Sequence, residues 1–287
     1  MKKVVIGYIF SEKRKGRDEK LFLKLAKKKN IELYMINSRK ISNINEIGEV
    51  ENIAKKCDIF YNNSAEEFAL EIAKMIEETG KRVIDSSRTY YYSEDKWMCY
   101  LICKENKIPT LNTILLSENL GVARKELKDF GHWPVILKRV YGCMGEYVDK
   151  ADDLNGAEKI IKKFWRKGSE KIPVIAQEFV KSSSYRVLVI GGKIVQTALK
   201  ESKNWKATGV HATKFKKFPV DKELIKVIKR LTNATKINVC GVDLFKKNGK
   251  WIVLEINAEP AFDFFENERE KIIGLVLDLV KSKVKKR

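Results

Sequence analysis

The segment from Val239 to Pro260, VCGVDLFKKNGKWIVLEINAEP, constrains the fold of this chain more than any other stretch. Its Asn248-Gly249 pair lies between two runs of strand-forming residues, so the segment predicts a β-hairpin. Apolar and polar residues alternate along both runs, which is typical of strands with one buried face. The apolar positions at a period of two are Val242, Leu244, Ile252, Leu254 and Ile256.

The register of this hairpin decides which residues share a face. A two-residue loop would pair Asp243 with Leu254 and place Glu255 and Asn257 on the opposite face. A three-residue loop, or a β-bulge, would pair Asp243 with Val253 instead. We expect the second arrangement, because it gathers the apolar side chains on one face and brings the two carboxylates and the amide together on the other.

Asp243, Glu255 and Asn257 offer only oxygen ligands. Oxygen ligands suit magnesium or manganese held partly by the phosphates of a nucleotide, and they do not suit zinc. A polar face that is simply covered by water is the alternative for a hairpin with this pattern. Pro260 and the motifs upstream favour the metal site.

The net charge of +20, from 58 basic and 38 acidic residues, indicates an anionic partner. Nucleotide phosphates, a polycarboxylate and a nucleic acid all satisfy that requirement. The five cysteines are odd in number and form no CxxC pair, which argues against a disulfide framework or a structural zinc site. No run approaches the ~18 apolar residues of a membrane span, and the first residues do not resemble a signal peptide. We therefore expect a cytoplasmic protein without membrane contact.

Residues 1–87 alternate short apolar runs with stretches of helical spacing, which predicts a small parallel α/β domain. The domain lacks a GxGxxG fingerprint, so dinucleotide binding is not indicated there. The expected strands are 3–10, 31–36, 58–61 and 82–85, and the expected helices are 18–29, 47–56 and 65–79.

Two lysines stand out in the next part of the chain. A helix from 94 to 106, capped by Ser93, would carry Lys96 in its first turn, where a lone cation opposes the helix dipole. A ligand would explain that position, and a solvated surface lysine is the alternative. Lys138 alternates with apolar residues at the end of a strand within 132–148.

Gly142 and Gly145 follow Lys138 and would allow the backbone to close over phosphates through its N–H groups. A plain turn is the alternative. Downstream, residues 173–180 read as a strand that ends in Gln177-Glu178, and a hairpin through Gly191-Gly192 follows.

Taken in this order, the motifs resemble those of the ATP-grasp superfamily, and within it the RimK-like carboxylate–amine ligases, over nearly the whole chain. The resemblance implies an α/β fold, with a small parallel N-terminal domain followed by a two-lobed ATP-grasp domain of α+β type. The implied limits are 1–87 for the N-terminal domain, 88–170 for the central lobe and 171–287 for the C-terminal lobe. ATP would lie between the two lobes.

The same resemblance implies roles for individual residues. Asp243, Glu255 and Asn257 would hold two magnesium ions. Arg186 and Lys200 would bind the substrate carboxylate or the transferring phosphoryl group. The nucleotide would be bound by Lys96, Lys138, Gly142, Gly145, Gln177, Glu178, Phe179, Val180, Ser184 and Lys206.

The implied reaction is attack of a carboxylate on the γ-phosphate of ATP, followed by displacement of phosphate by an amine to form an amide. We expect an anionic carboxylic acid and an amino acid, with glutamate favoured, and a homo-oligomeric enzyme. The acceptor site would be bordered by Arg186, Lys200 and residues 259–265. The three phenylalanines of that segment either pack as core or form an apolar wall that selects a ring-bearing acceptor.

A protein that binds or modifies nucleic acid, such as RNA or tRNA, on the same scaffold is the alternative function. Its basis is a cluster of basic residues with aromatic residues between them, which would track phosphates in a salt-dependent manner. The cluster consists of Lys214, Lys216, Lys217, Lys226, Lys229 and Arg230, with Phe215 and Phe218 interleaved.

Overall fold

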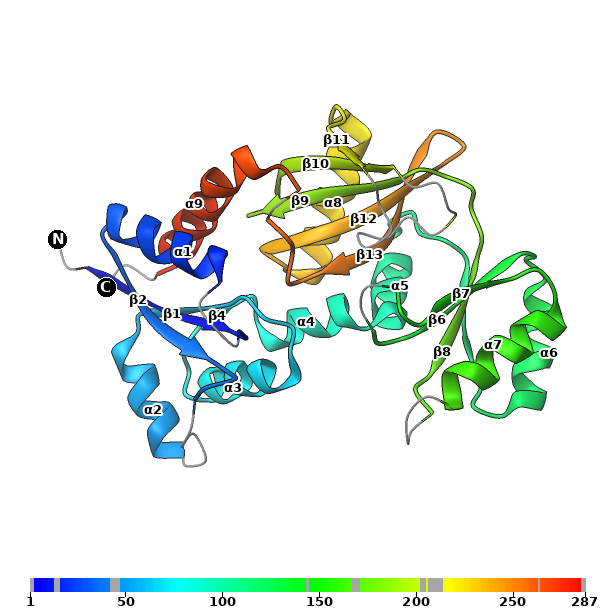
Figure 1. Cartoon of the computed structure of the whole chain (residues 1–287), viewed down its shortest axis with the longest axis horizontal. Helices are drawn as coiled ribbons and strands as arrows, with labels where there is room; N and C mark the ends of the chain where they lie inside the picture. The colour runs from blue at the N-terminus through cyan, green and yellow to red at the C-terminus, as the bar shows by residue number, and fades with distance from the viewer. Residues whose placement is uncertain are drawn as a thin grey trace.

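The structure is a computed structural model that describes residues 3–12, 16–41, 47–142, 145–166, 171–201, 205, 214–262 and 264–284. Three sheets follow one another along the molecule, with the N-terminal domain at one end and the sheet of the central lobe at the other (Figure 1). This mixed architecture confirms the α/β fold class. In the described part of the chain, no helix is both long and apolar enough to cross a bilayer.

The N-terminal domain is built on a parallel sheet with the order β2-β1-β3-β4, as the alternation of strand and helix patterns predicts. Buried aliphatic residues and Tyr8 line its central strand β1. The strands are β1 (Val4–Phe10), β2 (Ile31–Asn37), β3 (Ile59–Asn62) and β4 (Val83–Ile84), and the helices are α1 (Arg17–Lys28), α2 (Ile47–Lys56) and α3 (Glu67–Glu78).

The central lobe is an antiparallel sheet with the order β5-β8-β6-β7, covered by two helices whose apolar faces form one core. The strand β8 lies beyond residue 170 and pairs with β5 and β6. The proposed domain limits remain a prediction. The elements are β5 (Thr113–Leu116), α6 (Leu120–Phe130), β6 (Val135–Arg139), β7 (Val148–Ala151), α7 (Leu154–Arg166) and β8 (Val174–Glu178).

The C-terminal lobe is an antiparallel sheet with the order β11-β10-β9-β12-β13. One apolar cluster joins this sheet to α8 and to the two helices within residues 87–105. The elements are β9 (Ser184–Ile190), β10 (Lys193–Glu201), β11 (Lys214–Lys216), α8 (Lys222–Thr235), β12 (Val239–Lys247) and β13 (Lys250–Asn257).

The helix expected from residue 94 to 106 is divided. α4 (Ser87–Glu94) ends at Asp95, and α5 (Lys96–Glu105) begins after it. The backbone of Asp95 is extended, and its carboxylate accepts hydrogen bonds from the N–H groups of Trp97 and Met98. Asp95 therefore caps the helix in place of Ser93, because it satisfies two N–H groups of the first turn.

The hairpin of β12 and β13 contains the expected bulge, but its register differs from the expected one. Asn248 and Gly249 form a two-residue turn, with φ angles of 51° and 77°. The register shifts between the pairs Asp243–Glu255 and Leu244–Val253. The predicted pairing of Asp243 with Val253 is therefore wrong, because the extra residue of the bulge lies on β13.

This bulge changes which residues of β13 are buried. Trp251 and Val253 pack in the core with Ile256. Leu254, which alternation assigned to the core, instead lines the cavity described below. The bulge shifts the side-chain alternation by one residue. The buried face of the strand therefore has odd-numbered residues before the bulge and an even-numbered residue after it.

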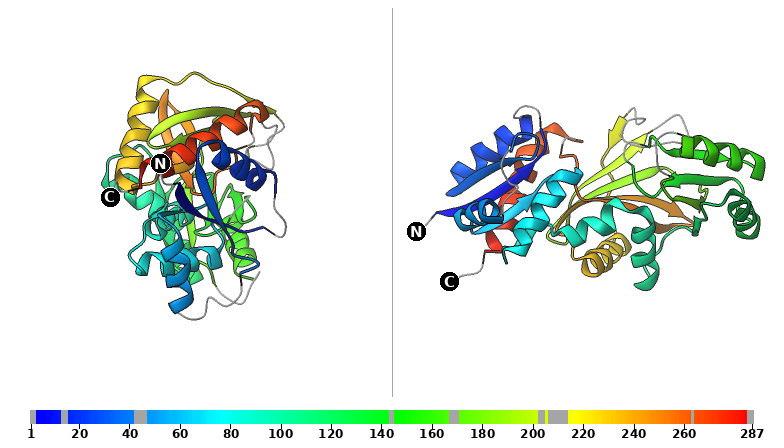
Figure 2. Two further views of the ribbon diagram at one scale, coloured as in Figure 1. Left: turned by 90° about the vertical axis from the view of Figure 1, so that its left-hand side faces the viewer. Right: turned by 90° about the horizontal axis from the view of Figure 1, so that it is seen from below.

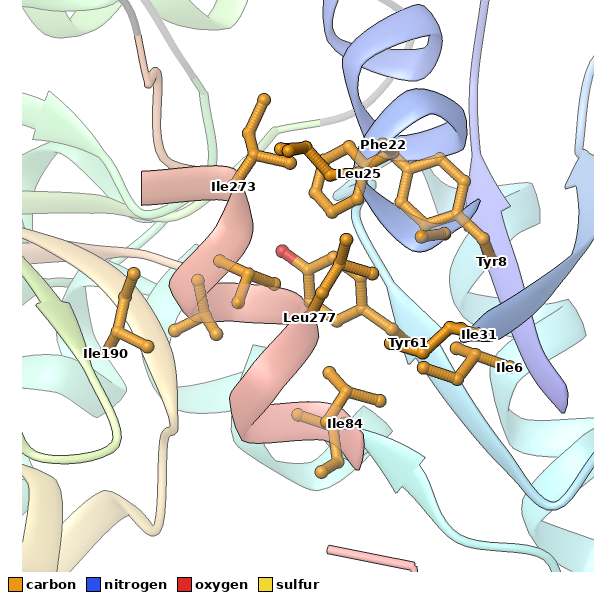
Figure 3. Close-up of a cluster of buried hydrophobic side chains, with 14 of the residues drawn as sticks. Ile6, Tyr8, Phe22, Leu25, Ile31, Tyr61, Ile84, Ile190, Ile273 and Leu277 are labelled. Carbon is orange, nitrogen blue, oxygen red and sulfur yellow. The ribbon is translucent and has the colours of Figure 1, made fainter. Parts of the chain in front are cut away.

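The C-terminal helix α9 (Glu266–Ser282) returns to the N-terminal domain and lies beside α1, as the views in Figure 1 and Figure 2 agree. Ile273 and Leu277 of α9 pack with Phe22 of α1 and Tyr8 of β1 (Figure 3). Ile190 of β9 contributes to the same cluster. The first and last parts of the sequence thus share one core with the C-terminal sheet.

Asp85 provides a polar link between the N-terminal domain and the C-terminal sheet. Its carboxylate accepts hydrogen bonds from the backbone N–H groups of Asn238 and Val239, both at 2.8 Å, and from Asn238 Nδ2 at 2.7 Å. Burial raises the pKa of Asp85 to about 6, although these donors oppose the shift. Asp85 is 3% exposed, so the link is buried away from solvent.

Candidate active site

A cavity of about 530 Å³ lies between the sheets of the central and C-terminal lobes. This volume is within the range of about 300–1,000 Å³ that holds a whole small-molecule ligand. Every predicted site residue that the structure describes lines it, and Lys206 lies outside the described residues. The lining includes Lys96, Lys138, Gly142, Gly145, Gln177, Glu178, Phe179, Val180, Ser184, Arg186, Lys200, Asp243, Glu255 and Asn257.

Asp243 forms two ion pairs at the floor of the cavity. Its Oδ1 lies 2.6 Å from Lys200 Nζ, and its Oδ2 lies 3.1 Å from Arg186 Nη1. Arg186 and Asp243 are direct partners on neighbouring strands, which explains their proximity. Burial works against the ionised carboxylate, but the two cations hold the pKa of Asp243 below its usual range.

Gly241 leaves the space that the guanidinium of Arg186 occupies. A Cβ at this position would lie 2.4 Å from Arg186 Nη2 and 2.6 Å from its Nε. A larger residue would therefore push the Arg186 side chain away from Asp243. The sequence pattern alone did not reveal this requirement.

Asp243, Glu255 and Asn257 share one face, as the parity argument predicted. Asp243 pairs directly with Glu255, and Gly241 pairs with Asn257. Asn257 Nδ2 lies 3.4 Å from Asp243 Oδ2. Two carboxylates and an amide at the edge of one cavity form a donor set that fits magnesium, with phosphate oxygens and water completing the coordination.

Lys138 is a buried cation on the opposite side of the cavity. It projects from β6 and donates a hydrogen bond to Gln177 Oε1 at 2.8 Å, while Gln177 in turn donates to Thr113 Oγ1 at 3.0 Å. Burial lowers the pKa of Lys138 to about 8, and the carboxylate of Glu255 partly opposes this effect. An anion in the cavity would be attracted by this charge.

Lys96 connects the first turn of α5 to the glycine loop. Its Nζ donates to the carbonyl oxygen of Gly142 at 2.8 Å, and its backbone N–H donates to Val140. Gly142 and Gly145 have φ angles of 132° and 70°, which residues with a side chain rarely adopt. The loop therefore needs glycine at both positions, beside a lysine that faces the cavity.

Glu178 is engaged by protein groups. Its Oε2 lies 2.7 Å from Lys247 Nζ, and its Oε1 accepts the N–H of Asn112 at 3.0 Å. Burial would raise the pKa of Glu178, but these partners hold it below its usual range. The carboxylate of Glu178 thus fixes the end of β8, next to the backbone of Phe179 and Val180 at the cavity wall.

Several lining residues were not expected from the sequence. Burial raises the pKa of Glu94 to about 7, and this residue ends the helix before Asp95. Trp205 lies edge-to-face with Phe179, with 6.4 Å between the ring centroids. The isolated tryptophan within a lysine-rich stretch was a usable signal, whereas nothing in the sequence distinguishes Glu94 from a surface acid.

The aromatic residues after the hairpin have different environments. Phe262 is 2% exposed and packs in the core of the N-terminal domain. The ring of Phe264 faces Arg186, with 5.7 Å between the guanidinium and the ring centroid. Phe218 of the basic cluster packs against Tyr185 and Trp251, so this ring is not available to stack on a base.

The sheet arrangement and the charged cavity between its two lobes define the chain as an ATP-binding enzyme of the ATP-grasp class. Residues 93–280 match the RimK-like ATP-grasp domain, and the chain belongs to that family. It is an ATP-dependent ligase that forms C–N bonds.

Individual relatives agree with this assignment. A coenzyme gamma-F420-2:alpha-L-glutamate ligase from Methanocaldococcus jannaschii is 23% identical over 82% of this chain and 93% of its own length. A probable alpha-L-glutamate ligase from Psychromonas ingrahamii is 29% identical over 75% of this chain and 72% of its own length. The crystal structure of a RimK domain ATP-grasp protein from Sphaerobacter thermophilus superposes with a TM-score of 0.73 at 14% identity, covering 97% of this chain and 100% of that one.

Proposed function

We propose that the enzyme joins a carboxylic acid to the amino group of an amino acid through an acylphosphate, with magnesium or manganese as the metal. A carboxylate oxygen of the acid attacks the γ-phosphorus of ATP, and ADP leaves. The amine nitrogen then attacks the acyl carbon, inorganic phosphate leaves, and the nitrogen loses a proton. The product is an amide.

One observation carries this proposal: buried cations and oxygen donors of both lobes face a single cavity. Lys138 comes from the central lobe, and the triad of Arg186, Lys200 and Asp243 comes from the C-terminal lobe. Phosphoryl transfer depends mainly on positioning and on fixed positive charge around the transferring group. This cavity offers both.

The residues of the chain have separable roles in this scheme. Lys96 and Lys138 bind the phosphate chain of ATP, and the backbone at Gly142 and Gly145 lies against it. Arg186 and Lys200 hold the attacking carboxylate and the γ-phosphoryl group. When bound at Asp243, Glu255 and Asn257, the metal supplies positive charge to the β- and γ-phosphate oxygens.

The names of the relatives support an amino acid as the amine, and they favour glutamate. The net charge of +20 and the cations of the cavity favour an anionic acid as its partner. ADP release should be measured with glutamate and other amino acids, each paired with a panel of carboxylic acids. Release that requires both an acid and an amine supports amide ligation, whereas release without an amine, or with a hydroxyl acceptor only, contradicts it.

A further inference from the structure

A second cavity, of about 250 Å³, lies where the N-terminal domain meets the segment that follows β13. It is smaller than the range of about 300–1,000 Å³ for sites that hold a whole ligand, so its size suits one end of a substrate. Its polar lining comes from both parts of the molecule. The polar residues are Ser11, Glu12, Asp18, Glu19, Asn63 and Glu259.

Four carboxylates face this cavity, and none of its described lining residues is basic. Asp18 is paired with Arg269 Nε at 2.5 Å, and Glu259 Oε2 accepts the N–H of Ala65 at 2.7 Å. Carboxylates gathered in this way repel one another unless a positive charge joins them.

Glu19 is the member of this group that needs a donor. The residue is 3% exposed, and its Oε2 is buried without a hydrogen-bond partner among the described residues. Its Oε1 lies 3.5 Å from the hydroxyl of Tyr8, at the limit of a hydrogen bond. A buried carboxylate oxygen without a donor is costly, so the site favours a ligand that brings one.

Glu12 and Glu19 converge on the same point. A Cβ placed on Gly16 would lie 2.6 Å from Glu19 Oε2 and 2.7 Å from Glu12 Oε2. An ammonium group, with three donors, or a guanidinium group, with five, could bond both carboxylates from one position.

We propose that this pocket binds a positively charged organic group, an ammonium or a guanidinium, that belongs to one of the two substrates of the ligase. The assignment of this cationic group to a substrate rests on the proposed function. Glu259 follows Asn257 by two residues, so the pocket begins within ~7 Å of the metal-binding strand along the chain. In this proposal, a substrate that reacts beside the metal-binding strand places its cationic end here.

Direct binding tests the pocket without requiring turnover. The full chain, with a non-hydrolysable ATP analogue and magnesium, is titrated calorimetrically with L-lysine, L-arginine and L-norleucine. Norleucine keeps the carbon chain of lysine and lacks its side-chain charge. We expect lysine or arginine to bind about tenfold tighter than norleucine or better, because a charged donor meets buried acceptors.

Glu19→Gln and Glu12→Gln should each remove this preference for a cation while leaving norleucine binding and ATP affinity unchanged. Glu32→Gln, at an exposed position on β2, is the matched control and should bind like the unmodified protein. Equal affinity for lysine and norleucine, failure of both basic amino acids to bind, or a cation preference that survives both variants overturns the proposal.

The same variants separate this inference from the ligase reaction. ADP release that depends on an acid and an amine, without any preference for a cationic substrate, leaves the proposed function standing and overturns the pocket. Lysine binding that depends on Glu19, with no ADP release from any pair, supports the pocket and contradicts the ligation. Where turnover occurs, placing the positive charge on the acid or on the amine identifies which substrate reaches this site.

Discussion

Lys200 and Asp243 form an ion pair that is nearly sealed from solvent: Nζ and Oδ1 are 2.6 Å apart, and the two side chains are 3% and 7% exposed. Removing the carboxylate would leave Lys200 buried without this counter-charge, whereas removing Lys200 would leave Asp243 with Arg186 as its partner. The pair lines the cavity proposed to bind ATP, where Arg186 adds a second cation. If the proposed function holds, stability and catalysis should depend on the same carboxylate.

Asp243→Asn should lower ADP release by about 100-fold or more, because it removes a charge that the metal and both cations require. It should also lower the free energy of unfolding by about 3–5 kcal/mol, since Lys200 and Arg186 lose their counter-charge. Steady-state ADP release and urea unfolding measure the two effects. Asp149→Asn, which removes an exposed ion pair with Lys163 and keeps an oxygen for the N–H of Lys150, is the control and should change stability by about 1 kcal/mol or less.

Glu255→Gln should separate the loss of turnover from the loss of stability. Among the described residues, Glu255 does not form an ion pair, so we expect turnover to fall by about 100-fold or more while unfolding changes little. Wild-type turnover in both Glu255→Gln and Asp243→Asn would show that these side chains do not hold a catalytic metal.

The KM for ATP should rise as the pH increases through about 8. The pKa of Lys138 lies near 8, below the usual value of 10.5, so its ammonium is charged below that pH and neutral above it. A neutral Lys138 attracts the phosphates less strongly. Lys138→Met should raise the KM near neutral pH and abolish this part of the pH dependence. Lys162→Met, at an exposed position on α7, is the control, and an unchanged pH profile in Lys138→Met would contradict the assignment.

Gly241→Ala should impair turnover more than folding. The added Cβ would displace the guanidinium of Arg186, which is the end of a flexible side chain and can move at little cost to the rest of the fold. We expect kcat to fall by about tenfold or more through loss of the fixed cation. Gly48→Ala, where a Cβ meets nothing within 4 Å, is the control and should leave kcat unchanged. Full activity of Gly241→Ala would show that Arg186 is not needed in its observed position.

Asp85 should make the protein less stable as the pH rises from about 4 to about 6. Its pKa is about 6 in the folded protein and 3.8 as the reference, so in this interval the folded state retains a proton that the unfolded state releases. Raising the pH therefore favours unfolding, by up to about 3 kcal/mol from this group. Urea unfolding at several pH values should show this contribution as the difference between the unmodified protein and Asp85→Asn. Identical pH slopes in the two proteins would contradict the raised pKa.

Local patterns were sufficient for much of the fold. Alternating apolar runs and helical spacing identified the N-terminal α/β domain, and the Asn248-Gly249 pair identified the hairpin. The shared face of Asp243 and Glu255 also followed from the alternation of side chains, because the polar residues of both strands had to lie opposite the buried apolar face. The division between α4 and α5 was missed, since Asp95 and Ser93 are both good caps and their backbone conformation decides between them.

By itself, the sequence determined the order of the motifs, the alternation of the strands and the set of oxygen and lysine side chains available to a nucleotide. These properties depend on residues that are close along the chain, so the spacing of apolar and polar residues reveals them. Only the tertiary structure decided the position of the bulge on β13, the two ion pairs of Asp243 and the convergence of Glu12 and Glu19 over Gly16. These depend on contacts between distant segments, where burial, charge and close packing select one arrangement among several that the local pattern allows.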